Sequence, residues 1–420
     1  MRRIILGILV LVMCLSLFAC KGADETPNAS AEPTVSESPD ETTAVPEPKP
    51  DKGLGYYDAE YDYTLQPRYT VAYITRHEGA DFRGMLEIWA ARFNCELDTF
   101  YAGSDAEVLT QTATLKAQGY AGFLFDAETA QYPAIAGRCK ELDVAWFAID
   151  KAPRGADGKL LHPWVTPDYA GLGADTAEYL MLHWNDTYLP SLPENTEVKN
   201  VGIIALGAQD DADFTAVSRG IADKLESYNE PTSSVWLPAT LFNIDSADGS
   251  ASGNAEQTIA KLNALLAENP DIDAWFVVAA NDSLAQGVSN FYPVAESGVV
   301  AVVTIGGASQ FRLWDADDAD EHHTAAAYTD GLLRMEPVFG GLYALMRGET
   351  TAEELWSPKW VNGGAGETYA SLQVPSAVID RTNYREYLEW VDLYTRVDRV
   401  QYNVFVVPEQ YPSRENPDFR

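Results

Sequence analysis

The stretch AWFVVAANDSLAQG, residues 274–287, decides the fold. Its first part, residues 275–279, is a short apolar run without polar alternation, which is typical of a strand covered by helices on both faces. Asn281 and Asp282 follow at once, and a helix is predicted after them. In an open parallel sheet this junction lies at the carboxyl ends of the strands, where ligands bind. A polar side chain here either caps the helix or binds a ligand, and the spacing alone leaves both roles open.

Strand and helix patterns alternate along the chain in two series. The first runs from a strand at 69–75 to a strand at 144–149, and the second runs from a helix at 170–184 to a strand at 299–305 and includes a strand at 234–241. This alternation indicates βαβ units on parallel sheets. Because the roughly 350 residues involved exceed what one hydrophobic core usually supports, the sequence predicts an α/β fold with two doubly wound parallel-sheet lobes.

The N-terminus has the pattern of an export signal. Residues 1–19 carry two arginines directly after Met1 and continue with an apolar run too short to span a bilayer comfortably. The sequence LFAC at 17–20 resembles the lipobox of bacterial lipoproteins, in which the cysteine is lipidated, so Cys20 is the predicted lipidation site. The alternative is an ordinary signal peptide with an incidental cysteine. The predicted location is therefore extracytoplasmic, with attachment to the bacterial cell membrane through the lipid.

Residues 20–68 are predicted to form an extended tether. The segment is rich in Pro, Glu, Thr, Ser and Asp and poor in aliphatic residues, so it buries too little apolar surface to offset its ordering entropy. A tyrosine cluster lies at its end, and the sequence leaves open whether these rings pack on the folded part: Tyr56, Tyr57, Tyr61 and Tyr63.

Composition limits the classes of partner and chemistry. The formal net charge of −34 opposes binding to nucleic acid. Two cysteines of the folded part, Cys95 and Cys139, form no disulfide framework, and buried thiols are favoured over a disulfide. The acidic run at 315–323 lacks the spacing of a calcium loop and is interpreted as a solvated loop rather than a metal site. Because no phosphate-binding, nucleophile-elbow or zinc-protease motif occurs, the chain is predicted to be no enzyme and to use no cofactor.

With these patterns in hand, the chain resembles the type I periplasmic binding proteins of ABC sugar transporters, especially the arabinose and ribose binders. Residues 281–287, NDSLAQG, fit the Asn-Asp-x-x-Ala-x-Gly motif that members commonly carry after a strand of the C-terminal lobe. The resemblance covers residues 69–390 and implies a three-segment hinge, with crossings near 162–165, 328–331 and 367–372. The chain departs from many sugar binders at Val217, where an arginine is common.

The resemblance also implies the division of the chain. The N-terminal lobe is expected to comprise 69–164 and 331–367, and the C-terminal lobe 165–330 and 368–396, followed by a tail at 397–420.

Candidate ligand-binding residues combine polar groups for hydroxyls with aromatic faces for a sugar ring. They are Arg76, Phe82, Asp126, Trp164, Gln209, Asp210, Asn281 and Asp282. Each also has a structural interpretation: Phe82 as a helix staple, Trp164 as hinge packing, Arg76 as the partner of a nearby acid, and the aspartates as turn or cap residues.

Three functions are compatible with the sequence. The leading hypothesis is a monomeric, lipid-anchored receptor that closes on a monosaccharide and delivers it to the permease subunits of an ABC transporter. The second is a receptor of the same fold that signals to a sensor kinase. The neighbouring genes would distinguish these two functions by encoding either permease and ATPase subunits or a kinase. An exported carbohydrate-active enzyme with paired carboxylates is the third, and a turnover assay would reveal it.

Replacing Cys20 with serine should abolish lipid labelling, because only the thiol is the predicted acceptor. Fatty-acid labelling and membrane fractionation of cells that express the Cys20→Ser chain should show either retained precursor or released protein. A lipid-labelled mature form identical to that of the unaltered chain would contradict the assignment.

Overall fold

The computed structural model describes residues 55–58, 61–76, 82–194, 196–228, 239–246, 255–291, 298–316, 323–356, 367–374 and 376–395. The predicted export signal, Cys20 and the tail at 397–420 lie outside these residues. Of the two units into which the chain divides, Met1–Pro50 and Asp51–Arg420, only the second contains described residues. Within them, none of the helices combines the length and apolar character needed to cross a bilayer.

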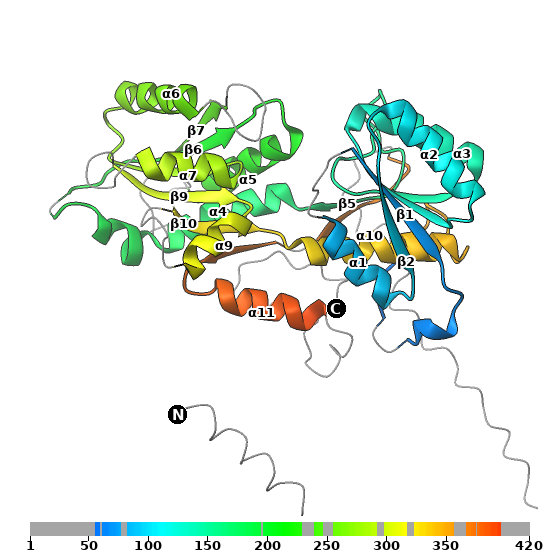
Figure 1. Ribbon diagram of the computed structural model, residues 1–420. Coiled ribbons are helices and arrows are strands. Elements are labelled where there is room, and N and C mark those ends of the chain that lie inside the picture. Colours follow the sequence, from blue (N-terminus) through cyan, green and yellow to red (C-terminus); the bar gives the residue numbers. More distant parts are fainter. Residues whose placement is uncertain are drawn as a thin grey trace, which may run out of the picture. The chain divides into compact units, whose positions relative to one another are not determined.

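The first lobe is built on a four-stranded parallel sheet (Figure 1). Its strand order is β2-β1-β3-β4. The strands are β1 (Thr70–Thr75), β2 (Glu96–Tyr101), β3 (Gly122–Asp126) and β4 (Ala145–Ala148). The helices that cover it are α1 (Phe82–Arg92), α2 (Asp105–Ala117), α3 (Tyr132–Leu142) and α10 (Gly331–Met346).

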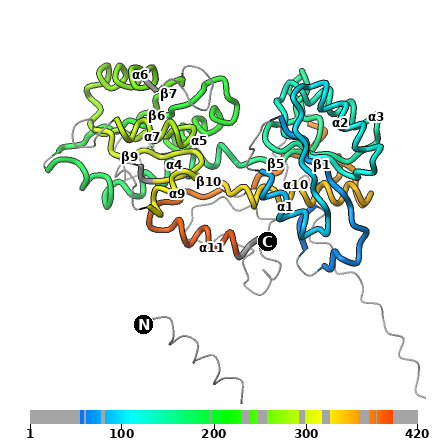
Figure 2. Tube along the Cα trace, in the orientation of Figure 1, coloured from blue at the N-terminus to red at the C-terminus, as the bar shows by residue number. Residues whose placement is uncertain are grey.

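Alternate side chains of strand β1 enter two different hydrophobic cores. Val71 and Tyr73 pack with residues of α1 and α10 on one face of the sheet. Ala72 and Ile74 pack with residues of α2 and α3 on the other face. Successive side chains of a strand point to opposite faces, so a strand that is apolar throughout needs helices on both sides. The trace in Figure 2 shows α1 and α10 side by side beneath this sheet.

The second lobe contains a six-stranded sheet in the order β12-β10-β9-β8-β6-β7. All neighbouring pairs are parallel except β10 with β12. The strands are β6 (Val201–Gly207), β7 (Ala239–Asp245), β8 (Ala274–Ala279), β9 (Val299–Ile305), β10 (His323–Tyr328) and β12 (Ala377–Asp380). The helices are α4 (Tyr169–Leu182), α5 (Ala212–Tyr228), α6 (Ala255–Glu268), α7 (Asp282–Phe291), α9 (Ala308–Asp315) and α11 (Tyr384–Thr395).

This sheet is also covered on both faces. Ile203 and Ala205 of β6 pack with α4 and α5, whereas Ile204 and Leu206 pack with α6 and α7. Helices α4 and α5 approach so closely that a Cβ added at Gly220 would lie 1.9 Å from a backbone oxygen of α4, so only glycine fits there. The predicted α/β class with doubly wound parallel sheets is confirmed.

Three segments of the chain connect the two sheets. A short parallel pair, β5 (Trp164–Pro167) with β11 (Ser371–Val374), accompanies two of them. Because Val165, Leu372 and Val374 belong to the core of the first lobe, the first crossing follows residue 167 and the third lies between β11 and β12. Both are therefore several residues later than expected, since each strand finishes its pairing before the chain crosses. The second crossing lies between β10 and α10.

Two other expectations from the sequence can be compared with the structure. Residues 239–241 of the strand predicted at 234–241 belong to β7, Ala239–Asp245, which pairs along its length with β6, and residues 234–238 lie outside the described residues. Cys95 and Cys139 are buried free thiols, as favoured by the sequence. Burial raises the pKa of Cys95 to about 12, so this thiol stays protonated and unreactive at neutral pH. Most of the acidic run at 315–323 lies outside the described residues.

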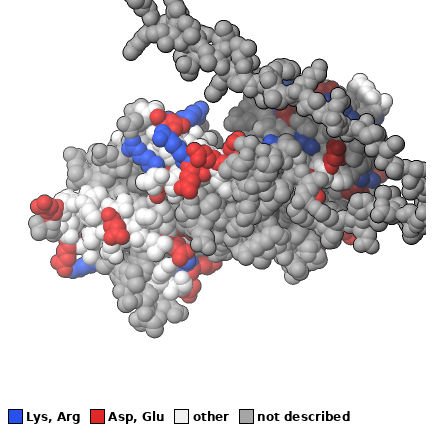
Figure 3. Space-filling view, turned by 90° about the horizontal axis from the view of Figure 1, so that it is seen from below, with Lys and Arg blue, Asp and Glu red and all other residues white. Residues whose placement is uncertain are grey.

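Acidic neighbours accompany basic side chains on the described surface. On the face seen in Figure 3, Lys and Arg side chains lie beside Asp and Glu. Arg83 pairs with Glu87 at 2.7 Å and Arg138 with Glu141 at 3.0 Å. Exposed pairs of this kind contribute at most about 1 kcal/mol each. The absence of a nucleic-acid partner stays a prediction.

The folded lobe begins earlier than residue 69, which corrects the expected extent of the tether. Tyr57 and Tyr63 are buried and stack on each other at 5.3 Å between ring centroids. The amide of Tyr57 donates to the buried carboxylate of Glu336 on α10 at 3.2 Å. A Cβ at Gly340 would lie 2.4 Å from the carbonyl oxygen of Gly55. We call residues 55–58 and 61–65 the tyrosine strap; its aromatic side chains bury enough apolar surface to order it.

The tyrosine strap should be required for full stability. Replacing buried Tyr57 with alanine should lower the free energy of unfolding by about 3 kcal/mol, because large aromatic deletions in a core leave a cavity. Urea denaturation measures this, and Leu65→Ala, at a position that is 79% exposed, is the control. A chain that begins at residue 69 should be less stable than one that begins at residue 52; equal stability would contradict the role of the strap.

Candidate functional site: a cavity between the two sheets

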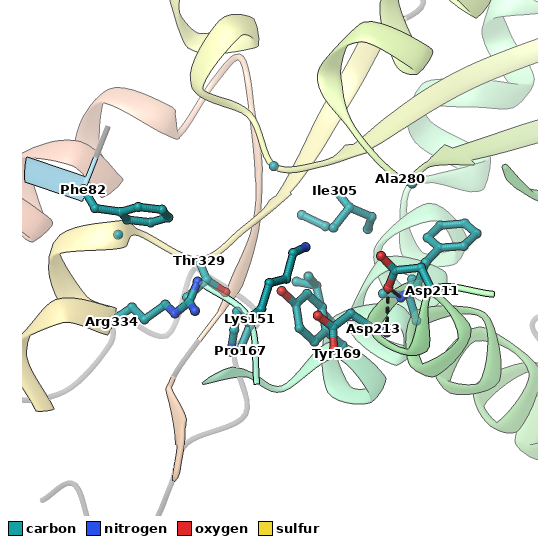
Figure 4. A pocket seen from close by; sticks show the side chains of 16 residues that line it. Phe82, Lys151, Pro167, Tyr169, Asp211, Asp213, Ala280, Ile305, Thr329 and Arg334 are labelled. Atoms are coloured by element: carbon teal, nitrogen blue, oxygen red, sulfur yellow. Dashed lines mark hydrogen bonds between the residues drawn. The ribbon is translucent and has the colours of Figure 1, made fainter. Parts of the chain in front are cut away.

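A cavity of about 350 Å³ lies beside the first and second crossings, at the strand ends of the second lobe (Figure 4). Its volume falls within the roughly 300–1,000 Å³ of small-molecule pockets. The first lobe and β5 contribute Phe82, Lys151, Pro167, Gly331 and Arg334, and the second crossing contributes Thr329. The second lobe contributes Tyr169, Leu172, Asp211, Asp213, Phe214, Val217, Ala280, Ile305, Gly306 and Ala327.

The second-lobe wall follows from the parallel sheet. Ala280 comes directly after β8, and Ile305 is the last residue of β9. These strands are parallel neighbours, so their carboxyl ends meet at one edge. Both residues line the cavity, which therefore occupies the position that open α/β sheets offer to ligands.

Arg334 is the cation held most firmly in the cavity wall. Its guanidinium lies 5.2 Å from the ring centroid of Trp164 and donates to the carbonyl oxygens of Ile149 and Asp150, the latter at 3.0 Å. Only 11% of its side chain is exposed. Its Nε is buried without a hydrogen-bond partner, and so is the hydroxyl oxygen of Thr329. Unpaired buried polar groups cost free energy, so a small rearrangement that brought these two into contact with a polar ligand would be favourable.

The opposite end of the cavity carries two carboxylates. One oxygen of Asp211 accepts from the amides of Asp213 at 2.8 Å and Phe214 at 3.1 Å, which caps α5. Asp213 keeps access to solvent, yet the loss of water around it raises the pKa of its carboxyl, and the charge of Asp211 adds to this shift. Lys151 and Arg334 lower that pKa from across the cavity. Figure 4 shows Lys151 between Arg334 and the two aspartates.

Aromatic rings supply apolar surface between these charges. Phe82 begins α1, Tyr169 begins α4 and Phe214 lies in the first turn of α5. Burial raises the pKa of the Tyr169 phenol, so the hydroxyl is neutral and available as a hydrogen-bond donor. Rings beside charged groups match a ligand with one apolar and one polar side.

Of the eight residues that the sequence singled out, Phe82 lines the cavity directly. Trp164 lies behind Arg334 and supports its guanidinium. Arg76 pairs with Asp105 on α2, while its Nε has no hydrogen-bond partner. Asp126 is buried and accepts from the hydroxyls of Tyr73 and Thr75 at 3.3 Å and 2.9 Å.

The loop after β6 places different residues at the cavity from those predicted. Gln209 and Asp210 are exposed and do not belong to the lining, whereas Asp211 and Asp213 do. The reason is that β6 continues to Gly207 and α5 begins only at residue 212, so the residues at the helix start face the cavity.

Asn281 and Asp282 also act within the protein rather than as lining residues. The side-chain oxygen of Asn281 accepts from the amide of Leu284 at 3.0 Å, which caps α7. Asp282 accepts from the hydroxyl of Thr304 and from the amide of Ser309, both at 2.8 Å. Their neighbour Ala280 lines the cavity in their place.

Sequence reasoning missed most of the lining. Lys151 directly follows the strand end at 148–150 and could have been found from that signal. Arg334 and Thr329 gave no local signal, because their orientation depends on how α10 packs beneath the first sheet. Within the described residues, no group of three or more His, Cys, Asp or Glu side chains could hold a metal ion.

Comparison with known proteins adds to this geometry. No protein-family model matches the sequence, and no curated protein matches it significantly. Solved structures do match in fold. A sugar-binding protein of a sugar ABC transporter from Bacillus halodurans has a TM-score of 0.53 at 14% identity, over 76% of this chain and 99% of that one. An ABC transporter solute-binding protein from Clostridium phytofermentans with bound β-D-glucose has a TM-score of 0.52 at 18% identity, over 76% and 96%.

A galactofuranose-binding protein matches with a TM-score of 0.51 at 14% identity, over 78% of this chain and all of that one. The two sheets, three crossings and cavity thus define a two-lobed α/β architecture. More specifically, the fold is that of the type I periplasmic binding proteins.

Asn281→Ala should lower the free energy of unfolding by about 1 kcal/mol, because it removes the side-chain cap of α7. Ser283→Ala, at an exposed position in the same first turn, should have a smaller effect. Thermal and urea unfolding of both variants measure the difference. Equal stability of the two variants would show that the cap contributes nothing.

Proposed function

We propose that this chain is an extracytoplasmic solute-binding protein of an ABC transporter and that it binds a neutral monosaccharide in the cavity. Binding without turnover is the function, and the permease subunits are the partners. The single observation that carries the proposal is the cavity itself, in which Arg334 Nε and the Thr329 hydroxyl are buried without partners. The solved structures of similar fold support it, since two of them are described as sugar-binding and one contains β-D-glucose.

The charges of the lining favour a neutral ligand. Lys151 and Arg334 carry two positive charges, and Asp211 and Asp213 carry two negative ones. Lys151 and Arg334 both pair with Asp150, at 3.7 Å and 3.9 Å. An anionic ligand would have to compete with Asp150 for these two cations, and a cationic ligand would be repelled by them, which costs free energy in a partly desolvated site. Hydroxyl groups instead donate to carboxylates and accept from guanidinium and ammonium groups.

Three crossing segments and a cavity lined from both lobes suit a mechanism in which ligand binding favours a closed state. The ligand would contact both walls only in that state, so binding shifts the equilibrium towards it. The lipid at Cys20 and the tether would keep the protein, which is predicted to be a monomer, close to its permease. Residues 20–54 are the tether in this proposal, because the tyrosine strap belongs to the first lobe.

A thermal-shift panel on the purified soluble chain tests the proposal. Neutral hexoses and pentoses, including D-glucose and D-arabinose, should raise Tm, since a ligand at 100 times its Kd adds about 2.7 kcal/mol of stability. D-Glucuronate and D-glucosamine should bind at least about tenfold more weakly than D-glucose. A tenfold rise in Kd corresponds to a loss of about 1.4 kcal/mol of binding free energy. A panel in which no neutral sugar raises Tm would contradict the proposed function.

A matched pair of arginine variants tests the site. Arg334→Lys should weaken binding of the active sugar about tenfold or more, because a lysine has neither an Nε nor a planar fork. Arg347→Lys is the control: Arg347 lies over the ring of Tyr343 at 5.5 Å and pairs with Glu349 at 2.7 Å, but it does not line the cavity. Calorimetric titration of both variants gives the Kd values, and equal affinities would place the ligand elsewhere.

A further inference from the structure

Asp282 connects three elements behind the second-lobe wall of the cavity. It is the first residue of α7. One carboxylate oxygen accepts from the hydroxyl of fully buried Thr304 on β9, and the other accepts from the amide of Ser309 in the first turn of α9. Both distances are 2.8 Å. Hydrogen bonds to a charged acceptor are among the stronger ones in proteins.

The segment between those two donors is the loop that lines the cavity. Ile305 and Gly306 belong to the lining. Gly306 and Gly307 have φ angles of 118° and 149°, which favour glycine, so the loop has no side chain of its own at these positions to hold it in place. The amide of Gly306 donates to the carbonyl of Ala327 at 2.9 Å. A Cβ added at Gly306 would lie 3.3 Å from the Asp282 carboxylate.

We propose that Asp282 is a positioning residue, which sets the shape of the second-lobe wall by fixing the Gly306–Gly307 loop at both ends. It acts on the ligand through this loop and not by contact. The inference rests on the proposed function for its effect on affinity, whereas its effect on the loop does not. Only a carboxylate serves both donors, because an asparagine offers one oxygen acceptor and turns an amide donor towards the other group.

Asp273 provides a matched control, because Asp282 follows strand β8 and Asp273 precedes it. It lies just before β8, and one of its carboxylate oxygens accepts from the amides of Lys199 at 2.8 Å and Asn200 at 3.1 Å. Each aspartate thus accepts two hydrogen bonds that join neighbouring segments. Asp273 does not line the cavity. Asp282→Ala and Asp273→Ala should therefore lower Tm to a similar extent.

Hydrogen exchange and affinity separate the two variants. In Asp282→Ala without ligand, the amides of residues 306–309 should exchange about tenfold faster or more, because Ser309 loses its charged acceptor. Asp273→Ala should leave these amides unchanged. Asp282→Asn keeps one acceptor oxygen and should show a smaller increase in the exchange rates of these amides. This variant tests the inference if the alanine variant folds poorly. For D-glucose, Kd should rise about tenfold in Asp282→Ala and remain unchanged in Asp273→Ala.

Unchanged exchange at Ser309 in both Asp282 variants would overturn the inference, and so would faster loop exchange with unaltered affinity for D-glucose. If the unaltered chain binds no sugar of the panel, the proposed function fails on that result alone. The exchange rates of residues 306–309 then decide whether Asp282 positions the loop.

Discussion

The burial of both faces of every central strand constrains the rest of the molecule. Strands such as β6 and β8 are buried at every position, so they offer no side chain to solvent along their length. Polar chemistry is then confined to the strand ends and to the helix starts that follow them. The cavity is lined by such positions: Ala280 after β8, Ile305 at the end of β9 and Asp213 at the start of α5. A parallel sheet collects these ends at one edge, which brings residues distant in sequence into one site.

Helix α10 contacts parts of the protein that are distant in sequence. It begins at the second crossing, where Asp330 caps it by accepting from the amide of Leu332 at 2.8 Å. Burial raises the pKa of the Asp330 carboxyl, and the backbone amides that bind the ionised form oppose the shift. One turn later Arg334 reaches the cavity, and Glu336 binds the tyrosine strap. A single helix therefore joins the second crossing, the cavity-lining cation Arg334 and the tyrosine strap.

For Asn281 and Asp282, the sequence motif predicted the correct position in the fold but did not decide the role of either residue. The sequence placed both residues at the right strand-to-helix junction and left open whether they cap the helix or bind a ligand. The structure uses Asn281 as the cap and Asp282 as a bridge to β9 and α9. The bridge could not be foreseen from spacing, because Thr304 and Ser309 lie more than twenty residues further along the chain. Their approach depends on β8 and β9 being neighbours in the sheet.

By itself the sequence determined the fold class, since apolar runs at strand length alternate with helical periodicity and admit few other arrangements. It also predicted two lobes and favoured buried thiols over a disulfide for Cys95 and Cys139, which the structure confirms. It placed one lining residue, Phe82, because that residue directly starts a helix after a strand. Tertiary structure alone decided the remaining lining, the later positions of two crossings and the burial of the tyrosine strap. The physical reason is the same in each case: these features depend on which side chains of distant segments share a face, and local periodicity carries no information on how α10 packs against Trp164, Tyr57 or the ends of the second sheet.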